Sequence, residues 1–315
     1  MPRVMPTDAP LRVRVPATSA NLGPGFDCLG LALDLHLEVG ARASDRDRFA
    51  YRGEGRLPDR PDGLVHVGFR AVFERLGRAA PKVALDARNP IPLARGLGSS
   101  SAALVAGAAL ADAWTGGALG RDGVFQLAAE LEGHPDNVAP AVYGGFTVSA
   151  PRPEGGYATS VLAVPPRWRL LFGVPDFELP TAEARAALPT TVHRDDAVRT
   201  AARAALWALA VARDEPALLR TASVDVLHEP YREPLVPGLR EARTALRAAG
   251  AYAAFLSGAG PTVGVVTPES AEVACRTVLE AFVGRRGRVL ALRAGAGYEV
   301  RGQPPVTPSD APTAP

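Results

Sequence analysis

PIPLARGLGSSSAAL, residues 90–104, is the most informative part of this sequence. Gly96 and Gly98 allow a positive φ and a close approach of the backbone to a ligand. Three serines at 99–101 follow, and they begin a stretch rich in Ala and Leu that predicts a buried helix over 99–114. The free N–H groups and the positive dipole end of such a helix stabilise a bound anion. The segment therefore predicts a phosphate site, although a plain glycine turn with a serine N-cap would have the same composition.

Other glycine-loop and nucleophile motifs do not fit this chain. The dinucleotide pattern G-x-G-x-x-G fails because position 101 is serine, and the hydrolase elbow G-x-S-x-G fails because no serine lies between the two spaced glycines. Lys82 is the only lysine, and it lies outside any glycine-rich loop. A Walker A loop, a protein kinase and a pyridoxal-phosphate enzyme each need a functional lysine, so these three classes are excluded.

The composition is that of an ordinary globular protein, with 47% apolar and 22% charged residues and a net charge of +2. A length of 315 residues suggests two domains. The near-neutral balance argues against a nucleic-acid partner, and no apolar run predicts a transmembrane helix or a signal peptide. Two cysteines make no disulfide framework, so we expect a cytoplasmic location. The oligomeric state stays open, with a homodimer as one option.

Strand and helix patterns mix without a regular βα order, which predicts an α+β fold. Strands are expected at 11–16, 29–40, 144–149, 169–175, 252–257, 262–267 and 289–293. Helices are expected at 64–77, 99–114, 122–132, 195–213 and 238–249, with Asp122 as the N-cap of the third. Proline and glycine gather in 150–168, so we divide the chain there into domains 1–160 and 161–301. Residues 302–315 have too little apolar content to pack and are expected to be disordered.

Three further segments carry polar residues on glycine-rich loops. They are PATSANLGPGFDCLGLALDL at 16–35, ELEGHPDNVAPAVYGGF at 130–146 and FLSGAGPTVGVV at 255–266. Taken singly, each has an ordinary alternative as a glycine turn, a solvated helix end or a hairpin turn. Short polar side chains on such loops also suit hydrogen bonding to a small polar substrate.

A magnesium site is expected beside the phosphate loop. One carboxylate aimed at the loop could hold Mg²⁺ with several waters retained. Glu132, near the probable helix end, and Glu130, two residues earlier, are the two candidates for that carboxylate. A zinc site is not expected, because the five histidines show no ligand spacing. His134, with no second histidine nearby, is better read as a hydrogen-bonding residue.

Taken together, the four segments resemble the signature of the GHMP kinases, the superfamily of galactokinase, homoserine kinase, mevalonate kinase and phosphomevalonate kinase. PLARGLGSSSA is similar to the family's ATP phosphate-binding motif, and FLSGAGPTV to its third motif. Within the superfamily the details resemble the homoserine kinases most, including PTAEARAALP at 180–189 and DVLHEPYREPLVPGL at 225–239. The resemblance implies an N-terminal domain like the second domain of ribosomal protein S5 and a ferredoxin-like C-terminal domain.

The resemblance also implies roles for individual residues. Ser100 and Glu132 would bind Mg²⁺. The catalytic residues implied are Asp27, Ser100 and Glu132. Asn21, Asp27 and Asn137 would contact the amino and hydroxyl end of homoserine. Its carboxylate would lie between Arg185 and Arg232, with Thr181 nearby. The ATP phosphates would contact Pro92, Leu93, Ala94, Arg95, Gly96, Leu97, Gly98, Ser99, Ser100, Ser101, Ala102, Gly258 and Gly260.

The activity implied is transfer of the γ-phosphoryl of ATP to the hydroxyl of L-homoserine, a step of threonine biosynthesis. Arginine offers a planar fork that matches a carboxylate, so the pair Arg185 and Arg232 favours a substrate with a carboxylate over an alcohol without one. The alternatives are another GHMP kinase, acting on mevalonate or a sugar, and a nucleotide-binding protein of the same fold without catalytic activity.

Overall fold

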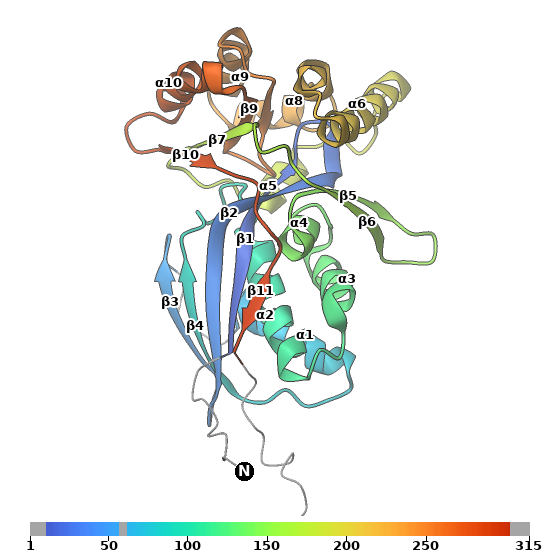
Figure 1. Cartoon of the computed structure of the whole chain (residues 1–315), viewed down its shortest axis with the longest axis vertical. Coiled ribbons are helices and arrows are strands. Elements are labelled where there is room, and N and C mark those ends of the chain that lie inside the picture. Colours follow the sequence, from blue (N-terminus) through green and yellow to red (C-terminus); the bar gives the residue numbers. More distant parts are fainter. Residues whose placement is uncertain (1–10, 57–61, 303–315) are drawn as a thin grey trace, which may run out of the picture.

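The computed structural model describes residues 11–56 and 62–302 (Figure 1). A sheet of seven strands forms the lower half, in the order β11-β1-β2-β4-β3, with β5 paired to β2 and β6 paired to β5. The strands are β1 (Leu11–Asn21), β2 (Gly25–Ala43), β3 (Arg48–Gly53), β4 (Val83–Asn89), β5 (Phe146–Pro151), β6 (Tyr157–Leu162) and β11 (Glu299–Arg301). β1 and β2 are the long strands of this sheet, and their upper ends reach the second half of the molecule.

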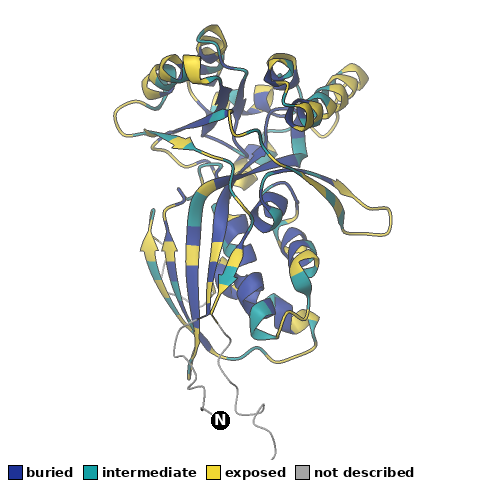
Figure 2. Cartoon of the chain, viewed as in Figure 1, coloured by how far each residue is buried: buried dark blue, intermediate teal, exposed yellow. Residues whose placement is uncertain are grey.

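Helices cover one face of the first sheet. They are α1 (Leu64–Arg75), α2 (Ser99–Trp114), α3 (Gly120–Glu132) and α4 (Val138–Tyr143). α1 and α2 cross closely because each has a glycine at the contact. A Cβ on Gly68 would lie 2.2 Å from the Leu104 carbonyl oxygen, and one on Gly107 would lie 2.0 Å from that of Val65. α2 is therefore locked against both the sheet and α1, and most of its residues are buried (Figure 2).

A second sheet, in the antiparallel order β10-β7-β9-β8, forms the upper half. Its strands are β7 (Arg169–Val174), β8 (Ala253–Leu256), β9 (Val263–Thr267) and β10 (Arg288–Leu292). The longer helices of this half are α6 (Arg194–Arg213), α9 (Leu239–Ala248) and α10 (Glu272–Val283). Short helices fill the connections, namely α5 (Thr181–Ala186), α7 (Leu219–Ala222), α8 (Glu229–Arg232) and the 3-10 turns Pro216–Leu218, Glu233–Leu235 and Glu269–Ala271.

The expected α+β fold is confirmed, and so are the predicted strands and helices; most ends shift by two residues or fewer, but β1 continues to Asn21 rather than 16 and β2 spans Gly25–Ala43 rather than 29–40. The predicted N-cap was wrong. α3 begins at Gly120, and Asp122 lies in its first turn, where its carboxylate accepts a 2.9 Å hydrogen bond from the Tyr143 hydroxyl. Periodicity alone could not show this, because Gly120 and Arg121 add two helical residues ahead of the apolar pattern.

The division of the chain at residue 160 remains a proposal. β6 spans that position and pairs with β5, and β11 returns to pair with β1 after the second sheet is complete. The segment expected to be disordered lies outside the described residues, apart from Gly302. Within residues 11–56 and 62–302, none of the helices has the length and apolar character needed to cross a membrane.

Candidate active site

A cleft of about 220 Å³ lies where the loop between β4 and α2 meets the start of β2, α5, α8 and the loop after β8. It gathers residues from all four of the polar segments identified in the sequence. Most of the predicted site residues line it, namely Asn21, Asp27, Pro92, Ala94, Arg95, Gly96, Leu97, Gly98, Ser99, Ser100, Glu132, Asn137, Thr181, Arg185, Arg232 and Gly258.

The loop before α2 requires its two glycines. Gly96 and Gly98 have φ values of 73° and 68°, in the left-handed region. A Cβ on Gly96 would lie 2.1 Å from the Ser257 carbonyl oxygen, and one on Gly98 would lie 1.9 Å from Thr18 Oγ1. The same neighbours hold the loop in place. Ser257 Oγ donates to the Gly96 carbonyl at 2.6 Å, and the Thr18 N–H donates to the Leu97 carbonyl at 3.1 Å.

The start of α2 offers unused hydrogen-bond donors. Gly98 is its N-cap, and no side chain caps the helix. The backbone N–H groups of residues 99–101 have no protein acceptor among the described residues, whereas that of Ala102 donates to the Gly98 carbonyl. No acidic residue lies in the first turn of this 16-residue helix. The three amides and the helix dipole therefore suit an anion.

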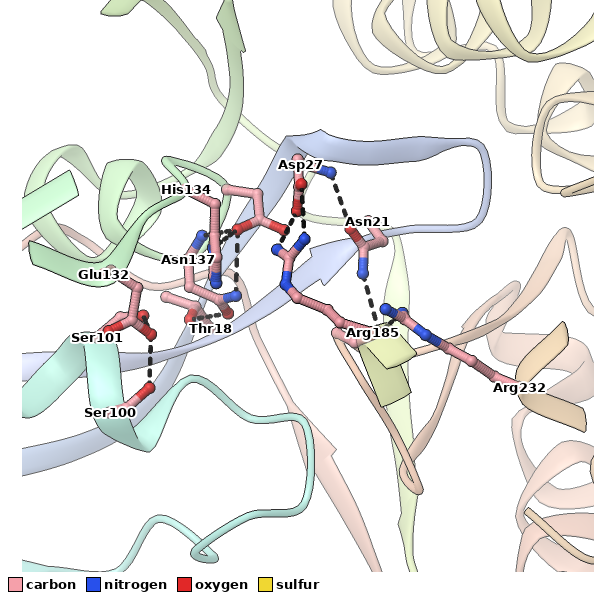
Figure 3. A network of polar contacts seen from close by, with 12 residues as sticks. Thr18, Asn21, Asp27, Ser100, Ser101, Glu132, His134, Asn137, Arg185 and Arg232 are labelled. Atoms are coloured by element: carbon pink, nitrogen blue, oxygen red, sulfur yellow. Dashed lines mark hydrogen bonds and ion pairs between the residues drawn. The ribbon is translucent and has the colours of Figure 1, made fainter. Parts of the chain in front are cut away.

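Glu132 faces this helix start (Figure 3). Its Oε1 accepts hydrogen bonds from Ser100 Oγ at 2.6 Å and from Ser101 Oγ at 2.8 Å. Glu130 points elsewhere, because two residues turn an α-helix by about 200°. Its carboxylate pairs with Arg75 at 2.5 Å, and 69% of its side chain is exposed. Of the two candidate carboxylates, only Glu132 lies beside Ser100.

Asp27 and Arg185 pair with each other at the other end of the cleft (Figure 3). Arg185 donates from Nη2 to Asp27 Oδ1 at 2.6 Å and from Nη1 to Oδ2 at 3.0 Å. The hydrogen bond that Arg185 donates to Asp27 raises the pKa of Arg185, whereas burial of the side chain lowers it. The hydrogen bond has the larger effect, so the pKa of Arg185 is raised. Asp27 has a φ of 53°, a strained conformation for a residue other than glycine.

Arg232 comes from α8 and is only 2% exposed. Its Nε donates to the Ala184 carbonyl at 3.1 Å, and its Nη1 to the Gly258 carbonyl at 3.2 Å. Nη2 has no acceptor among the described residues, and Arg232 lines the cleft. Burial, reinforced by the positive charge of Arg185, lowers the pKa of Arg232 to about 10, so its guanidinium remains charged at neutral pH.

The predicted amide ligands have partners within the protein. Asn21 donates from Nδ2 to the Gly258 carbonyl at 2.9 Å, and its Oδ1 accepts the Asp27 N–H at 3.1 Å. Asn137 Oδ1 accepts from Thr18 Oγ1 at 2.8 Å. These contacts fix the shape of the cleft. Direct contact of Asn21, Asn137 or Thr181 with a substrate stays a prediction.

Four predicted phosphate-loop residues do not line the cleft, namely Leu93, Ser101, Ala102 and Gly260. Ala102 is fully buried, and Gly260 packs against Leu256. The side chain of Arg95 is occupied elsewhere, because it donates to the carbonyls of Pro175 at 3.1 Å and Asp176 at 2.7 Å. Arg95 thus links the loop to the segment that follows β7.

Four residues that line the cleft were not among the predicted site residues, namely Phe26, Ala259 and the titratable pair His134 and Asp136. His134 Nδ1 lies 2.5 Å from Asp136 Oδ1. Burial acts to lower the pKa of His134, but the hydrogen bond and charge of Asp136 outweigh it, so the pKa is raised. One ligand atom each from Asp27, His134 and Asp136 lie within 4.8 Å of one another. The HPDN motif at 134–137 is visible in the sequence, but only the fold brings His134 and Asp136 close to Asp27.

A second feature that the sequence analysis missed is an apolar pocket of about 290 Å³ beside the loop. Ala94, Ser99 and Ser100 line both the cleft and this pocket. Leu93 and Ala103 of the same segment also line it, and its other walls come from outside that segment, namely Leu37, Phe49, Tyr51, Asp62, Gly63, Leu64, Val65, Ala87 and Asn89. No local motif marks it, because its residues belong to β2, β3, β4, α1 and α2.

An anion site with a carboxylate beside it, next to an apolar pocket and facing two arginines, defines a phosphotransferase of small molecules. Models of known families agree, since the GHMP kinases N terminal domain matches residues 64–145 and the GHMP kinases C terminal matches residues 205–284. A homoserine kinase of Thermus thermophilus is 50% identical over 91% of this chain and 97% of its own length. One of Moorella thermoacetica is 45% identical over 80% of this chain and 85% of its own.

Solved structures give the same result. The crystal structure of homoserine kinase from Cytophaga hutchinsonii matches with a TM-score of 0.83 and 26% identity, over 96% of this chain and all of that one. L. major mevalonate kinase, at 13% identity and a TM-score of 0.67 over 92% of this chain and 99% of its own, shares the fold. This chain belongs to the GHMP kinases and, among them, to the homoserine kinase family.

Proposed function

We propose that this protein transfers the γ-phosphoryl group of ATP to the hydroxyl of L-homoserine, giving O-phospho-L-homoserine and ADP. The observation that carries the proposal is the two-ended cleft. Free amides and the Ser100–Glu132 pair lie at one end, and Asp27, Arg185 and Arg232 lie at the other. The homoserine oxygen bonds to the γ-phosphorus, the bond from that phosphorus to the β–γ bridging oxygen breaks, and the hydroxyl proton leaves.

The nucleotide fits the loop and the apolar pocket. The amides of residues 99–101 are aimed donors for phosphate oxygens. The apolar pocket shares Ala94, Ser99 and Ser100 with the cleft, which supports it as the place of the adenine. Its polar groups include Asn89, whose Nδ2 lies 3.2 Å from Ser99 Oγ. The phosphates would then extend from the pocket towards the cleft.

Magnesium fits the residues beside the loop. Ser100 and Glu132 offer a hydroxyl and a carboxylate, the hard oxygen donors that Mg²⁺ prefers. These two residues would hold the ion against the phosphates, and the bound ion would supply charge neutralisation on the β- and γ-phosphate oxygens. Ser101, which donates to the same Glu132 oxygen, would keep that carboxylate in place.

The amino acid fits the opposite end as a zwitterion. A planar guanidinium fork matches a carboxylate, so Arg185 and Arg232 would bind the homoserine carboxylate. Asp27 would bind its ammonium group, Asn21 and Asn137 would contact the amino and hydroxyl end, and Thr181 would lie near the carboxylate. The Asp27–Arg185 pair must separate for this, because each group is the other's partner without substrate.

Phosphoryl transfer needs alignment and charge stabilisation more than a strong base. Holding the two substrates in line contributes roughly 7–11 kcal/mol of barrier reduction in well-oriented systems. The loop amides stabilise charge that builds on the transferred group. Asp27 orients the hydroxyl end and accepts its proton late in the transfer. We place the reaction in threonine biosynthesis and in the cytoplasm, with a homodimer as the proposed assembly.

An ADP-release assay with several acceptors tests this function. Purified protein with Mg·ATP is given L-homoserine, mevalonate, galactose or no acceptor. We expect ADP release with homoserine alone, and a phosphorylated amino acid as the product. Turnover only with mevalonate or galactose would replace the substrate, and nucleotide binding without turnover on any acceptor would mean a binding protein on the same fold.

A further inference from the structure

His228 lies directly behind Arg232 and is fully buried. It stands at the N-cap of α8, and its backbone N–H donates to Asp225 Oδ2 at 2.8 Å. Its ring Nδ1 lies 3.1 Å from Arg232 Nη1, and its Nε2 lies 2.8 Å from the Gly23 carbonyl oxygen. The ring therefore bridges an arginine of the cleft and the turn between β1 and β2.

These two contacts fix the protonation of the ring. A guanidinium can only donate hydrogen bonds, so Nδ1 of His228 must accept the bond from Arg232. A carbonyl oxygen can only accept, so Nε2 of His228 must carry a proton and donate it to the Gly23 carbonyl. His228 is thus a neutral imidazole in a single tautomer. Burial, with the positive charge of Arg232, keeps it neutral and lowers its pKa to about 4 against the pull of Asp225.

The orientation of Arg232 depends on few groups. Its other acceptors are the backbone carbonyls of Ala184 and Gly258. His228 provides its only side-chain acceptor among the described residues. Phe26 lines the cleft, and its ring lies 5.4 Å from the His228 ring and 5.4 Å from the Arg232 guanidinium carbon. With Nε and Nη1 held, Nη2 of Arg232 remains available to a ligand.

We propose that His228 is a positioning residue, which orients Arg232 to bind the substrate carboxylate and ties it to the turn that leads into Asp27. The inference rests on the proposed function. The bond to Gly23 lies four residues before Asp27, so one buried ring connects the carboxylate end of the site to its ammonium end. Loss of the Arg232 bond alone should then weaken homoserine binding and leave ATP binding unchanged.

Two amide substitutions separate the two bonds of the ring. In His228→Asn the amide oxygen lies near the place of Nδ1, so the acceptor for Arg232 is kept and the donor to Gly23 is lost. In His228→Gln the amide nitrogen lies near the place of Nε2, so the donor is kept and the acceptor is lost. Steady-state kinetics for both substrates and thermal melting are measured for the two variants and the wild type.

We expect His228→Gln to raise the KM for homoserine about tenfold or more, since the lost bond involves a charged group. His228→Asn keeps the acceptor for Arg232 and loses only the tie to Gly23, so it should raise that KM by a clearly smaller factor, and the KM for ATP should not change in either variant. Both variants should melt below the wild type, because each loses one buried bond. The proposal would be overturned if the two variants had equal homoserine KM values. It would also be overturned if the rise in KM in each variant simply matched its loss of melting temperature.

A measurement on the wild-type protein covers the case in which a variant does not fold. Nitrogen NMR of the histidine rings at neutral pH should show His228 protonated at Nε2 and bare at Nδ1. A doubly protonated ring, or a proton on Nδ1, would exclude the bond from Arg232 and with it the proposal. Failure of the proposed function would look different, because the wild type would then release no ADP with homoserine while the tautomer stayed as described.

Discussion

Asp27 and Arg185 form a two-bond ion pair in the cleft, with N···O distances of 2.6 and 3.0 Å, although they lie 158 residues apart in the chain. The two groups proposed to bind the substrate's ammonium and carboxylate therefore satisfy each other when no substrate is present. A zwitterion can replace both halves of this pair at once. A ligand with one charge would leave the other partner without a counter-charge, which is costly in a half-buried site.

The first prediction concerns substrates that lack one charge. 4-Hydroxybutanoate lacks the ammonium group of homoserine, and 3-aminopropanol lacks its carboxylate, while both keep a primary hydroxyl. We expect kcat/KM to fall on the order of a hundredfold for each in the ADP-release assay. If an analogue had the same kcat/KM as homoserine, the charged group that it lacks would not be bound by Asp27 or Arg185.

The second prediction separates the two glutamates of α3. Glu132→Gln removes the charge beside Ser100 and should lower Mg·ATP-dependent kcat strongly, and Ser100→Ala should lower it in the same sense. Glu130→Gln is the matched control, since its carboxylate pairs with Arg75 on the outer surface. It should retain wild-type turnover, because an exposed pair contributes at most about 1 kcal/mol to stability. The reverse pattern would assign the metal to Glu130.

The third prediction concerns the carboxylate clamp. Arg232→Ala should raise the KM for homoserine by at least about tenfold, because it removes a buried charged donor, with the KM for ATP nearly intact. Arg240→Ala is the control, because Arg240 is 77% exposed and pairs with Glu233 at the surface. An unchanged homoserine KM in Arg232→Ala would remove the clamp from the account.

The fourth prediction uses two glycines with similar backbones. Gly98 and Gly116 have φ values of 68° and 78°, so alanine is strained at both. Only at Gly98 would the new Cβ collide with a neighbour, Thr18 Oγ1, whereas nothing lies within 4 Å at Gly116. Gly98→Ala should therefore reduce turnover on the order of a hundredfold by moving the loop. If Gly116→Ala lost as much activity, strain rather than loop placement would be the cause.

The fifth prediction is a pH dependence of stability. The folded-state pKa of His228, about 4, lies below the value of about 6.5 for an unfolded histidine. Between these values the unfolded chain binds the proton more readily, so the free energy of unfolding falls as the pH falls from 6.5 to 4. Burial of the ring is the largest cause of the lowered pKa, and this part of the stability is lost as the ring takes up its proton. Arg232 and Arg243 add to this shift, and Asp225 opposes it.

Denaturant unfolding at several pH values measures this contribution. His228→Gln should lose stability less steeply than the wild type between pH 6.5 and 4. The comparison is between the two proteins because other groups also contribute: the pKa values of His36 and His66 are lowered and act in the same sense, whereas those of Glu229 and His134 are raised and act in the opposite sense. Identical slopes in the two proteins would show that His228 is not held neutral by its surroundings.

Local sequence patterns predicted the loop well. Gly96, Gly98 and the serines that follow them have short-range roles in a turn and a helix start, which a single segment can reveal. The choice between Glu130 and Glu132 needed the position of the helix as well. Both fit the motif, and only packing of α3 against α2 turns one of them towards Ser100.

Long-range pairings could not be read from the sequence. The bond between Asp27 and Arg185 joins the first sheet to α5, and the side chain of Arg95 turns to the carbonyls of Pro175 and Asp176. The apolar pocket likewise has no motif, since its walls come from five separate elements. His228 lies only four residues before Arg232, but its other partner, Gly23, is 205 residues away and became visible only in the fold.

A crystal structure with a non-hydrolysable ATP analogue and L-homoserine tests the central claim most directly. We predict phosphates on the amides of residues 99–101, and the homoserine carboxylate on Arg185 and Arg232, with the Asp27–Arg185 pair opened. Phosphates bound away from the start of α2, or an amino acid bound without contact to either arginine, would contradict the account.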